Sequence, residues 1–80
     1  MKELLEFIAK ELADEPDAVE VTEIEDDRGT LLQLSVAEGD MGRIIGRGGR
    51  IARAIRSVVK TVAIREDRRV AVEILDPDEG

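Results

Sequence analysis

The chain lacks cysteine, histidine, tryptophan and tyrosine, and phenylalanine occurs once in its 80 residues. Without cysteine there is no disulfide and no thiolate metal site, and without histidine the common zinc sites and histidine-based catalysis are excluded. The shortage of aromatic side chains also removes base stacking, the main sequence-tolerant source of affinity for single-stranded nucleic acid. We expect no metal site, no cofactor and no small-molecule substrate.

Long apolar runs are absent as well. No stretch approaches the length that a membrane span needs, and the acids among residues 1–6 are untypical of a signal peptide. With 42% apolar and 39% charged residues, the composition is typical of a folded domain near the lower size limit for one core. We expect a single domain over residues 1–80, located in the cytoplasm and not associated with a membrane.

Acidic residues outnumber basic ones, and the formal net charge is −7, but the two signs are segregated. Residues 41–69 hold nine basic residues against two acids, a local charge of +7. The remaining residues hold three basic residues against seventeen acids, a charge of −14. This pattern predicts one positive surface on an acidic molecule, and the local field decides what binds there.

Hydrophobic periodicity in the first half predicts a helix followed by two strands. The helix covers residues 2–14 and is stopped by Pro16. The first strand begins near residue 19, and its alternation slips before residue 24, which predicts a bulge or an early end. A turn at 26–29 then leads into the second strand at 30–36, and the short connection makes the pair an antiparallel hairpin.

The second half predicts two helices and a last strand. Asp40 is a suitable N-cap for a short helix at 41–45, and a longer helix runs from Arg50 to about residue 64. The last strand covers 70–75, and a frayed acidic tail follows at 76–80. The predicted apolar side of the long helix consists of Ile51, Ile55, Val58, Val59 and Val62, with Arg53, Arg56 and Lys60 nearly opposite. Arg28 is expected to be an ordinary surface charge.

The order helix, strand, strand, short helix, long helix, strand predicts an α+β fold. A helical crossover between the second and third strands makes these two strands parallel. We therefore expect a small three-stranded mixed sheet with helices packed on one face.

The glycine-rich segment 46–49 lies between the two predicted helices. Its backbone N–H groups are not obstructed by Cβ atoms, and the helix that follows adds the partial positive charge of its N-terminus. Arg47 and Arg50 border the same segment. These features predict a binding site for a phosphodiester chain, although the glycines could instead form a simple tight turn between helices.

Enzymatic alternatives fit the segment poorly. A nucleotide-hydrolysing P-loop requires a lysine followed by serine or threonine, which is missing after Gly46, and the dinucleotide-binding fingerprint also fails because Ile51 stands where it needs glycine. The basic segment holds only Glu66 and Asp67 as acids, which leaves little for a carboxylate-based hydrolase. We expect a protein that is not an enzyme.

The segment Ile45-Gly46-Arg47-Gly48-Gly49 between two helices resembles the Ile-Gly-x-x-Gly signature of KH domains. The element order resembles the type II arrangement, and the match from Asp40 to Lys60 is similar to bacterial single-domain KH proteins of the KhpA family. The resemblance covers roughly residues 3–75. It implies binding of single-stranded RNA, with about four nucleotides clamped against the Gly-x-x-Gly loop, and a role as a small RNA chaperone or post-transcriptional regulator.

Carried onto this sequence, the resemblance implies a set of RNA-binding residues around the loop. The expected residues are Ile45, Gly46, Arg47, Gly48, Gly49, Arg50, Ala52, Arg53 and Arg56. Ala52 departs from the isoleucine or valine that KH domains often carry at this position, which implies a roomier groove floor.

The resemblance also implies dimers, either with a second copy or with a larger KhpB-like RNA-binding protein. The alternative function is therefore a protein–protein adaptor that uses a KH-like fold mainly for assembly. A flat response of nucleic-acid binding to salt would favour the adaptor.

Overall fold

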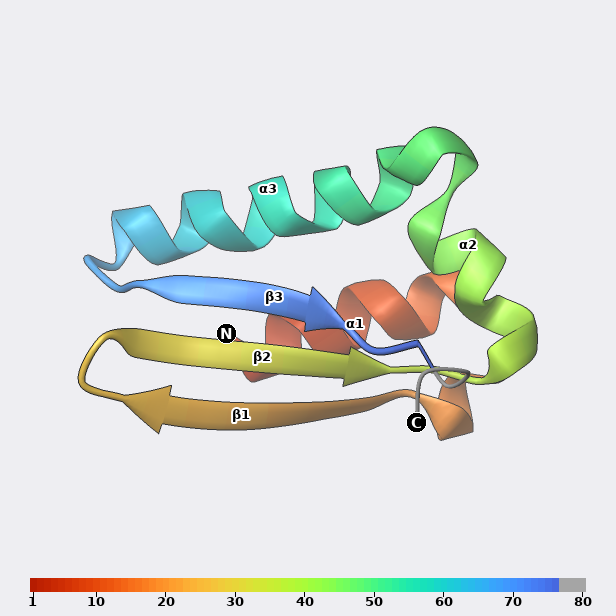
Figure 1. Cartoon of the computed structure of the whole chain (residues 1–80), viewed down its shortest axis with the longest axis horizontal. Helices are drawn as coiled ribbons and strands as arrows, with labels where there is room; N and C mark the ends of the chain where they lie inside the picture. Colours follow the sequence, from red (N-terminus) through yellow and green to blue (C-terminus); the bar gives the residue numbers. More distant parts are fainter. Residues whose placement is uncertain (77–80) are drawn as a thin grey trace.

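The computed structural model describes residues 1–76, and it forms a three-stranded sheet with helices on one face (Figure 1). Strand β1 pairs antiparallel with β2, and β3 pairs parallel with β2 on its other edge. This confirms the predicted α+β fold and mixed sheet. Apart from Asp76, the predicted tail lies outside the described residues. The elements are α1 (Lys2–Leu12), β1 (Glu20–Asp26), β2 (Gly29–Ser35), α2 (Met41–Ile45), α3 (Arg50–Arg65) and β3 (Val70–Ile74).

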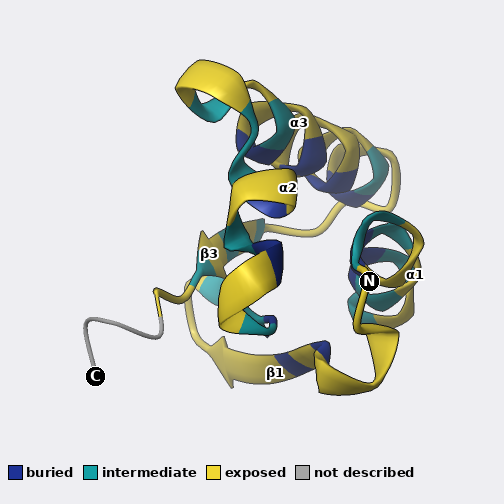
Figure 2. Cartoon of the chain, turned by 90° about the vertical axis from the view of Figure 1, so that its right-hand side faces the viewer, coloured by how far each residue is buried: buried dark blue, intermediate teal, exposed yellow. Residues whose placement is uncertain are grey.

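The core lies between the inner face of the sheet and helices α1 and α3 (Figure 2). Leu32 and Leu34 alternate along β2, point into this core and are fully buried, as the alternation of the sequence predicts. Leu5 of α1 and Val59 of α3 enter the core from the helices and are also fully buried. The outer face of the sheet carries no helix, so its side chains are exposed or half-buried.

Strand β1 is regular, and the predicted bulge or early end is wrong. Its residues pair one-to-one with β2 from Glu20 to Asp26 without an extra residue. Val21 points inward and is buried, whereas Ile24 points outward, pairs with Leu31 and is 44% exposed. The alternation therefore slips because an isoleucine lies on the outer face of the sheet, and not because the strand is broken.

Helix α3 has the predicted extent, but its buried side is rotated from the predicted one. Its buried residues are Ala52, Ile55, Val59 and Ala63, so small alanines and not Val58 face the sheet. Val58 is 45% exposed. The prediction weighted large apolar residues, whereas close packing of α3 against β3 favours alanines at the contact.

Asp40 precedes α2, as expected, but the prediction that its side chain caps this helix is wrong. The carboxylate makes no capping hydrogen bond to α2. Its two oxygens instead accept the N–H groups of Asp14 and Glu15, each at 3.0 Å, just beyond the end of α1. Asp40 thereby fixes the segment after α1, which ends at Leu12 and so two residues earlier than predicted.

Candidate nucleic-acid interface

The loop of residues 46–49 connects α2 to α3 through three glycines with positive φ. Gly46 has φ 75° and ψ 172°, a region that only glycine adopts readily, and an added Cβ would clash with the side chain of Ile51. Gly48 has φ 63° and faces open space, since no atom lies within 4 Å of an added Cβ. Gly46 is therefore required by packing, whereas Gly48 leaves the outer side of the loop open to a ligand.

The loop's own hydrogen bonds decide which amides a ligand can use. Gly46 N–H donates to the Gly42 carbonyl at 2.9 Å, Gly49 N–H to the Gly46 carbonyl at 3.1 Å, and Arg50 N–H to the Arg47 carbonyl. Among the described residues, no hydrogen bond occupies the N–H groups of Arg47 and Gly48. Two of the four N–H groups of the segment are therefore free, and they lie at its two central positions.

Two arginines of α3 reach neighbouring backbone and shape the interface. Arg53 Nη1 donates to the Gly48 carbonyl at 3.0 Å and so braces the loop. Arg56 Nε donates to the Val72 carbonyl at 3.3 Å and so links α3 to the edge strand β3. Sequence periodicity placed both side chains on the polar side of α3 but could not show that they hold backbone carbonyls.

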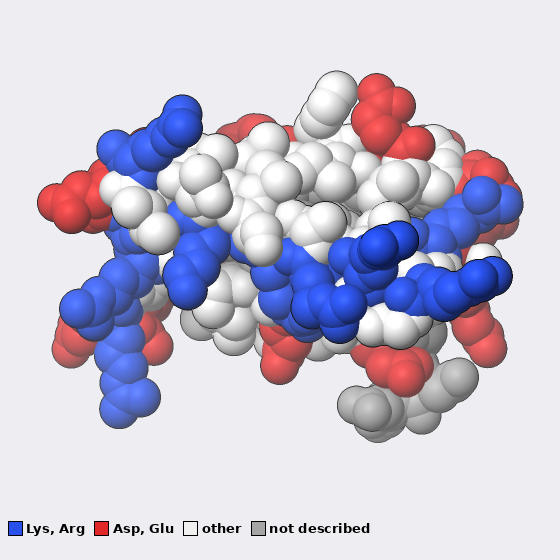
Figure 3. All heavy atoms as spheres, turned by 90° about the horizontal axis from the view of Figure 1, so that it is seen from above, with Lys and Arg blue, Asp and Glu red and all other residues white. Residues whose placement is uncertain are grey.

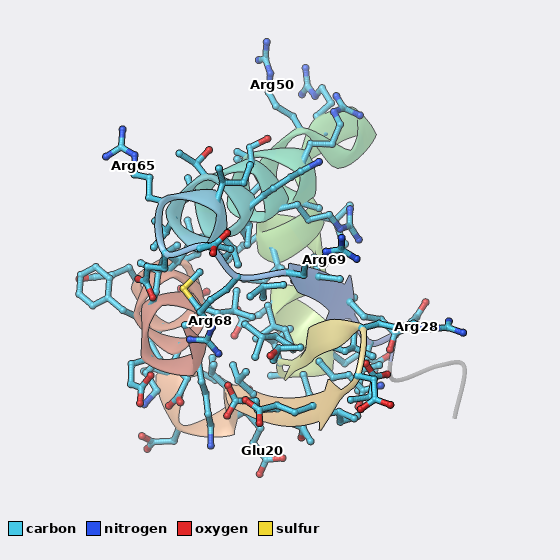
Figure 4. The ribbon with its side chains drawn as sticks, turned by 90° about the vertical axis from the view of Figure 1, so that its left-hand side faces the viewer. Glu20, Arg28, Arg50, Arg65, Arg68 and Arg69 are labelled. Carbon is cyan, nitrogen blue, oxygen red and sulfur yellow. The ribbon has the colours of Figure 1, made fainter. Side chains whose placement is uncertain are left out.

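Basic side chains gather along one long side of α3 and continue past its end (Figure 3). Arg47 and Arg50 are exposed at the loop, and Arg50 points away from the body of the domain (Figure 4). Arg53, Arg56 and Lys60 are exposed along the helix. The side chains of Arg47, Arg50 and Lys60 form no ion pair within the described part of the chain, so their charges are available to an anionic ligand.

The apolar members of the expected site lie beneath this surface. Ile45 ends α2 and is half-buried, and Ala52 is only 4% exposed in the first turn of α3. Ile55, one turn further on, is 3% exposed. Ala52 and Ile55 therefore form a closed floor, and Ile45 is partly open beside it. The accessible part of the interface consists of loop backbone, guanidinium groups and part of Ile45, and the expected extra room at Ala52 is not open to solvent.

Arg43 lies close to the loop but is paired with acids. Its Nη2 contacts Asp14 Oδ2 at 2.9 Å, and its Nε lies 3.8 Å from Asp40 Oδ1. The hydrogen bonds from the Asp14 and Glu15 amides, together with the Arg43 charge, hold the pKa of the Asp40 carboxyl below its ordinary value. Arg43 and Asp40 therefore tie α2 to the end of α1, and this network supports the loop from below.

A second surface feature lies on the opposite flank of α3, where α3 meets α1. The two helices leave an open groove with almost wholly apolar walls. Phe7 of α1 is 63% exposed at its rim, and Val58 of α3 faces it from the other helix. The groove is also lined by Leu4, Ile8, Ile51 and Ala54. Sequence periodicity placed Ile51 and Val58 on the apolar side of the long helix and so missed that Val58 remains exposed.

No helix in residues 1–76 is both long and apolar enough to cross a membrane. Within the same residues, no group of three or more acidic side chains is arranged to hold a metal ion.

Comparison with known proteins places the chain in a family. The family described as "KhpA/KhpB, KH domain" matches residues 2–74. A relative named RNA-binding protein KhpA, from Clostridium acetobutylicum, is 53% identical over 75 residues, which cover 94% of this chain and all of the relative. Proteins of the same name are 52% identical over 75 residues in Clostridium perfringens and 41% identical over 76 residues in Aquifex aeolicus. The Clostridium perfringens match covers 94% of this chain and 100% of that relative. The Aquifex aeolicus match covers 95% of this chain and 96% of that relative.

No solved structure gives a significant match to the chain. The family match and the relatives nevertheless cover nearly all of it, and the observed element order agrees with the type II KH arrangement that the predicted element order resembles. The chain belongs to the KhpA/KhpB family of KH domains.

Proposed function

We propose that the protein binds single-stranded RNA, with the phosphates held against the open side of the loop of residues 46–49. The observation that carries this proposal is the pair of free N–H groups at Arg47 and Gly48. Exposed arginines lie beside them, and no side chain covers Gly48. Relatives that share about half of the sequence are named RNA-binding proteins. Backbone amides and guanidinium groups are the donors that phosphate contacts use.

The proposed residues have separate tasks. The amides of Arg47 and Gly48 contact phosphate, while Gly46 and Gly49 adopt the positive φ angles that shape the loop. Arg47, Arg50 and Arg56 supply charge, and Arg53 holds the Gly48 carbonyl. Ile45 and Ala52 form the floor. No aromatic side chain lies here for base stacking, so binding rests on phosphate contacts and shallow apolar contact, as suits a small RNA chaperone or post-transcriptional regulator of the cytoplasm that performs no catalysis.

Replacement of Arg47 and Gly48 by aspartate tests this proposal. Both residues are exposed and Asp tolerates the left-handed conformation at position 48, so the fold should persist. The double substitution changes the loop charge by −3, and we expect binding of a short single-stranded RNA to be abolished in fluorescence anisotropy. The matched control is Arg47→Asn with Gly48→Asn, which has the same shape but removes only one charge and should bind weakly. Equal affinity of the aspartate variant and the parent would refute the assignment.

The apolar groove between α1 and α3 supports a second function, the assembly of dimers. An exposed phenylalanine facing an exposed valine across an apolar groove is typical of a protein–protein contact. The groove lies on the flank of α3 opposite to the basic residues, so RNA and a protein partner can bind together. The partner is a second copy of this chain or a KhpB-like RNA-binding protein.

Self-association is tested by sedimentation equilibrium of Phe7→Asp and Val58→Asp variants. The matched control is Ile64→Asp, because Ile64 is 65% exposed on α3 but does not line the groove. We expect the two groove variants to be monomeric at concentrations at which the parent and the control are dimeric. A monomeric parent would restrict the groove to an unlike partner, and dimers of all variants would show that the groove is not the contact.

A further inference from the structure

The outer face of the sheet contains a hollow where the β1–β2 turn meets the start of β3. Its volume is about 280 Å³. Leu31 of β2 and Ala71 of β3 are paired neighbours and form an apolar floor. Arg28, Arg69 and Asp26 lie around this floor. The hollow thus combines two cations, one carboxylate and an apolar surface within a few residues of one another.

The backbone around the hollow is held in place by short contacts. Thr30 N–H donates to the Arg69 carbonyl at 2.8 Å, which joins the turn to β3. Gly29 has φ 143°, and an added Cβ would lie 2.5 Å from the same carbonyl oxygen, so only glycine permits this approach. Asp26 Oδ1 accepts the N–H groups of Arg28 at 2.7 Å and Gly29 at 3.2 Å, which fixes the turn. The hollow is therefore formed before any ligand binds.

The arginines near this end of the domain point in different directions (Figure 4). Arg28 and Arg69 point to the same side, the outer face of the sheet. Arg65 points to the opposite side, and Arg68 lies on the helix side of the sheet, where its Nη2 lies 3.9 Å from Glu25 Oε1. Neither Arg28 nor Arg69 forms a side-chain ion pair with any described residue. These two charges are therefore available at the hollow.

The hollow lies at the far end of the basic side of α3. Helix α3 has 16 residues and so extends about 24 Å from the glycine loop. In the space-filling view the basic side chains form a nearly continuous band from the loop along this helix to the turn end of the sheet (Figure 3). A KH loop clamps about four nucleotides. A longer RNA strand that follows the band beyond these nucleotides would therefore reach the hollow.

From this placement we infer that the hollow is a second nucleotide-binding site, which takes a nucleotide beyond the four held at the glycine loop. The inference rests on the proposed RNA binding. The base lies over Leu31 and Ala71, and Arg28 and Arg69 contact its flanking phosphates. Asp26 Oδ2 forms no hydrogen bond with the described residues, so it can accept a hydrogen bond from an amino group of the base. This contact favours cytosine, which has such a group, over uracil, which has none.

RNA length tests the site. Fluorescence anisotropy compares four- and eight-nucleotide RNAs on the parent, on Arg28→Ala with Arg69→Ala, and on a control that loses two charges elsewhere, Arg65→Ala with Lys10→Ala. We expect the hollow variant to lose on the order of five- to tenfold in affinity for the longer RNA, the size expected for two exposed charge contacts. Its affinity for the shorter RNA and both affinities of the control should stay within about twofold of the parent, since no contact at the hollow is involved.

The possible failures are distinguishable. A parent that binds neither RNA refutes the proposed function and the hollow with it. A parent that binds both, with a hollow variant that loses no more for eight nucleotides than for four, refutes the hollow alone.

Base preference provides an independent readout. In the parent, the gain in affinity from four to eight nucleotides should be larger for oligocytidine than for oligouridine. Asp26→Asn keeps an oxygen for the two turn amides but presents an amino group to the base, so it should reduce or reverse this difference. An equal gain for both bases in the parent would refute the role of Asp26.

Discussion

Gly46 and Gly48 occupy one loop, yet the structure predicts different costs for replacing each with alanine. At Gly46 the backbone lies in a region open to glycine alone, which costs alanine about 1–3 kcal/mol. The new Cβ would also overlap Ile51, and such overpacking costs a further amount of about 1–3 kcal/mol. At Gly48 the left-handed conformation costs about 1–2 kcal/mol and the space around it is open.

We expect Gly46→Ala to lower the free energy of unfolding by about 2–6 kcal/mol and Gly48→Ala by about 1–2 kcal/mol. A domain of this size has about 4–12 kcal/mol in total, so Gly46→Ala could leave it largely unfolded. The chain has no tryptophan or tyrosine, and urea denaturation is therefore followed by far-UV circular dichroism. Equal losses for the two variants would refute the view that Gly46 is required by packing against Ile51.

Three further predictions concern salt, acid and the loop. If three phosphates are neutralised, log affinity for a short single-stranded RNA should fall against log salt with a slope near −2, from roughly −0.7 per phosphate; a flat response would contradict phosphate binding. The folded-state pKa of Asp40 lies below that of an unfolded aspartate, about 3.9. Its contribution is therefore present at neutral pH and lost as the pH falls through the folded pKa. Urea midpoints of the parent should exceed those of Asp40→Asn by a constant amount at pH 6–8, and the gap should narrow below about pH 4; a gap that widens in acid would contradict the assignment. Arg53→Ala should speed hydrogen exchange at Gly49, whose N–H donates to the Gly46 carbonyl, because the brace on the Gly48 carbonyl is lost and the loop opens more often; unchanged exchange would show that the brace is not needed.

Much of the fold could be predicted because periodicity and turn residues agree along the chain. Alternation along β2 identified Leu32 and Leu34 as core, and the glycine loop lies between two helices as predicted. The failures occur where a local pattern was judged without its tertiary partner. Ile24 faces outward from a regular strand, and Val58 remains exposed because alanines occupy the contact between α3 and the sheet. Asp40 has the residue type of a helix cap, but its carboxylate bonds to amides 25 and 26 residues away.

The candidate site was predictable in its residues but not in its bonds. The glycine spacing indicated the loop, and the charge pattern indicated the basic side of α3. Which amides remain free depends on hydrogen bonds between neighbouring turns, and these follow from backbone angles that the residue types only restrict. The positions of Arg28 and Arg69 on one face depend on the pairing of a turn with a distant strand, for which a single sequence contains no signal.

In the proposed complex, RNA phosphates contact the free amides of Arg47 and Gly48. Titration of the nitrogen-15-labelled protein with a four-nucleotide single-stranded RNA, followed by amide chemical shifts in NMR spectra, tests this most directly. We expect the largest shifts at the amides of Arg47 and Gly48, with smaller ones along the first turns of α3. Shifts confined to the groove between α1 and α3, or an unchanged loop under saturating RNA, would contradict it.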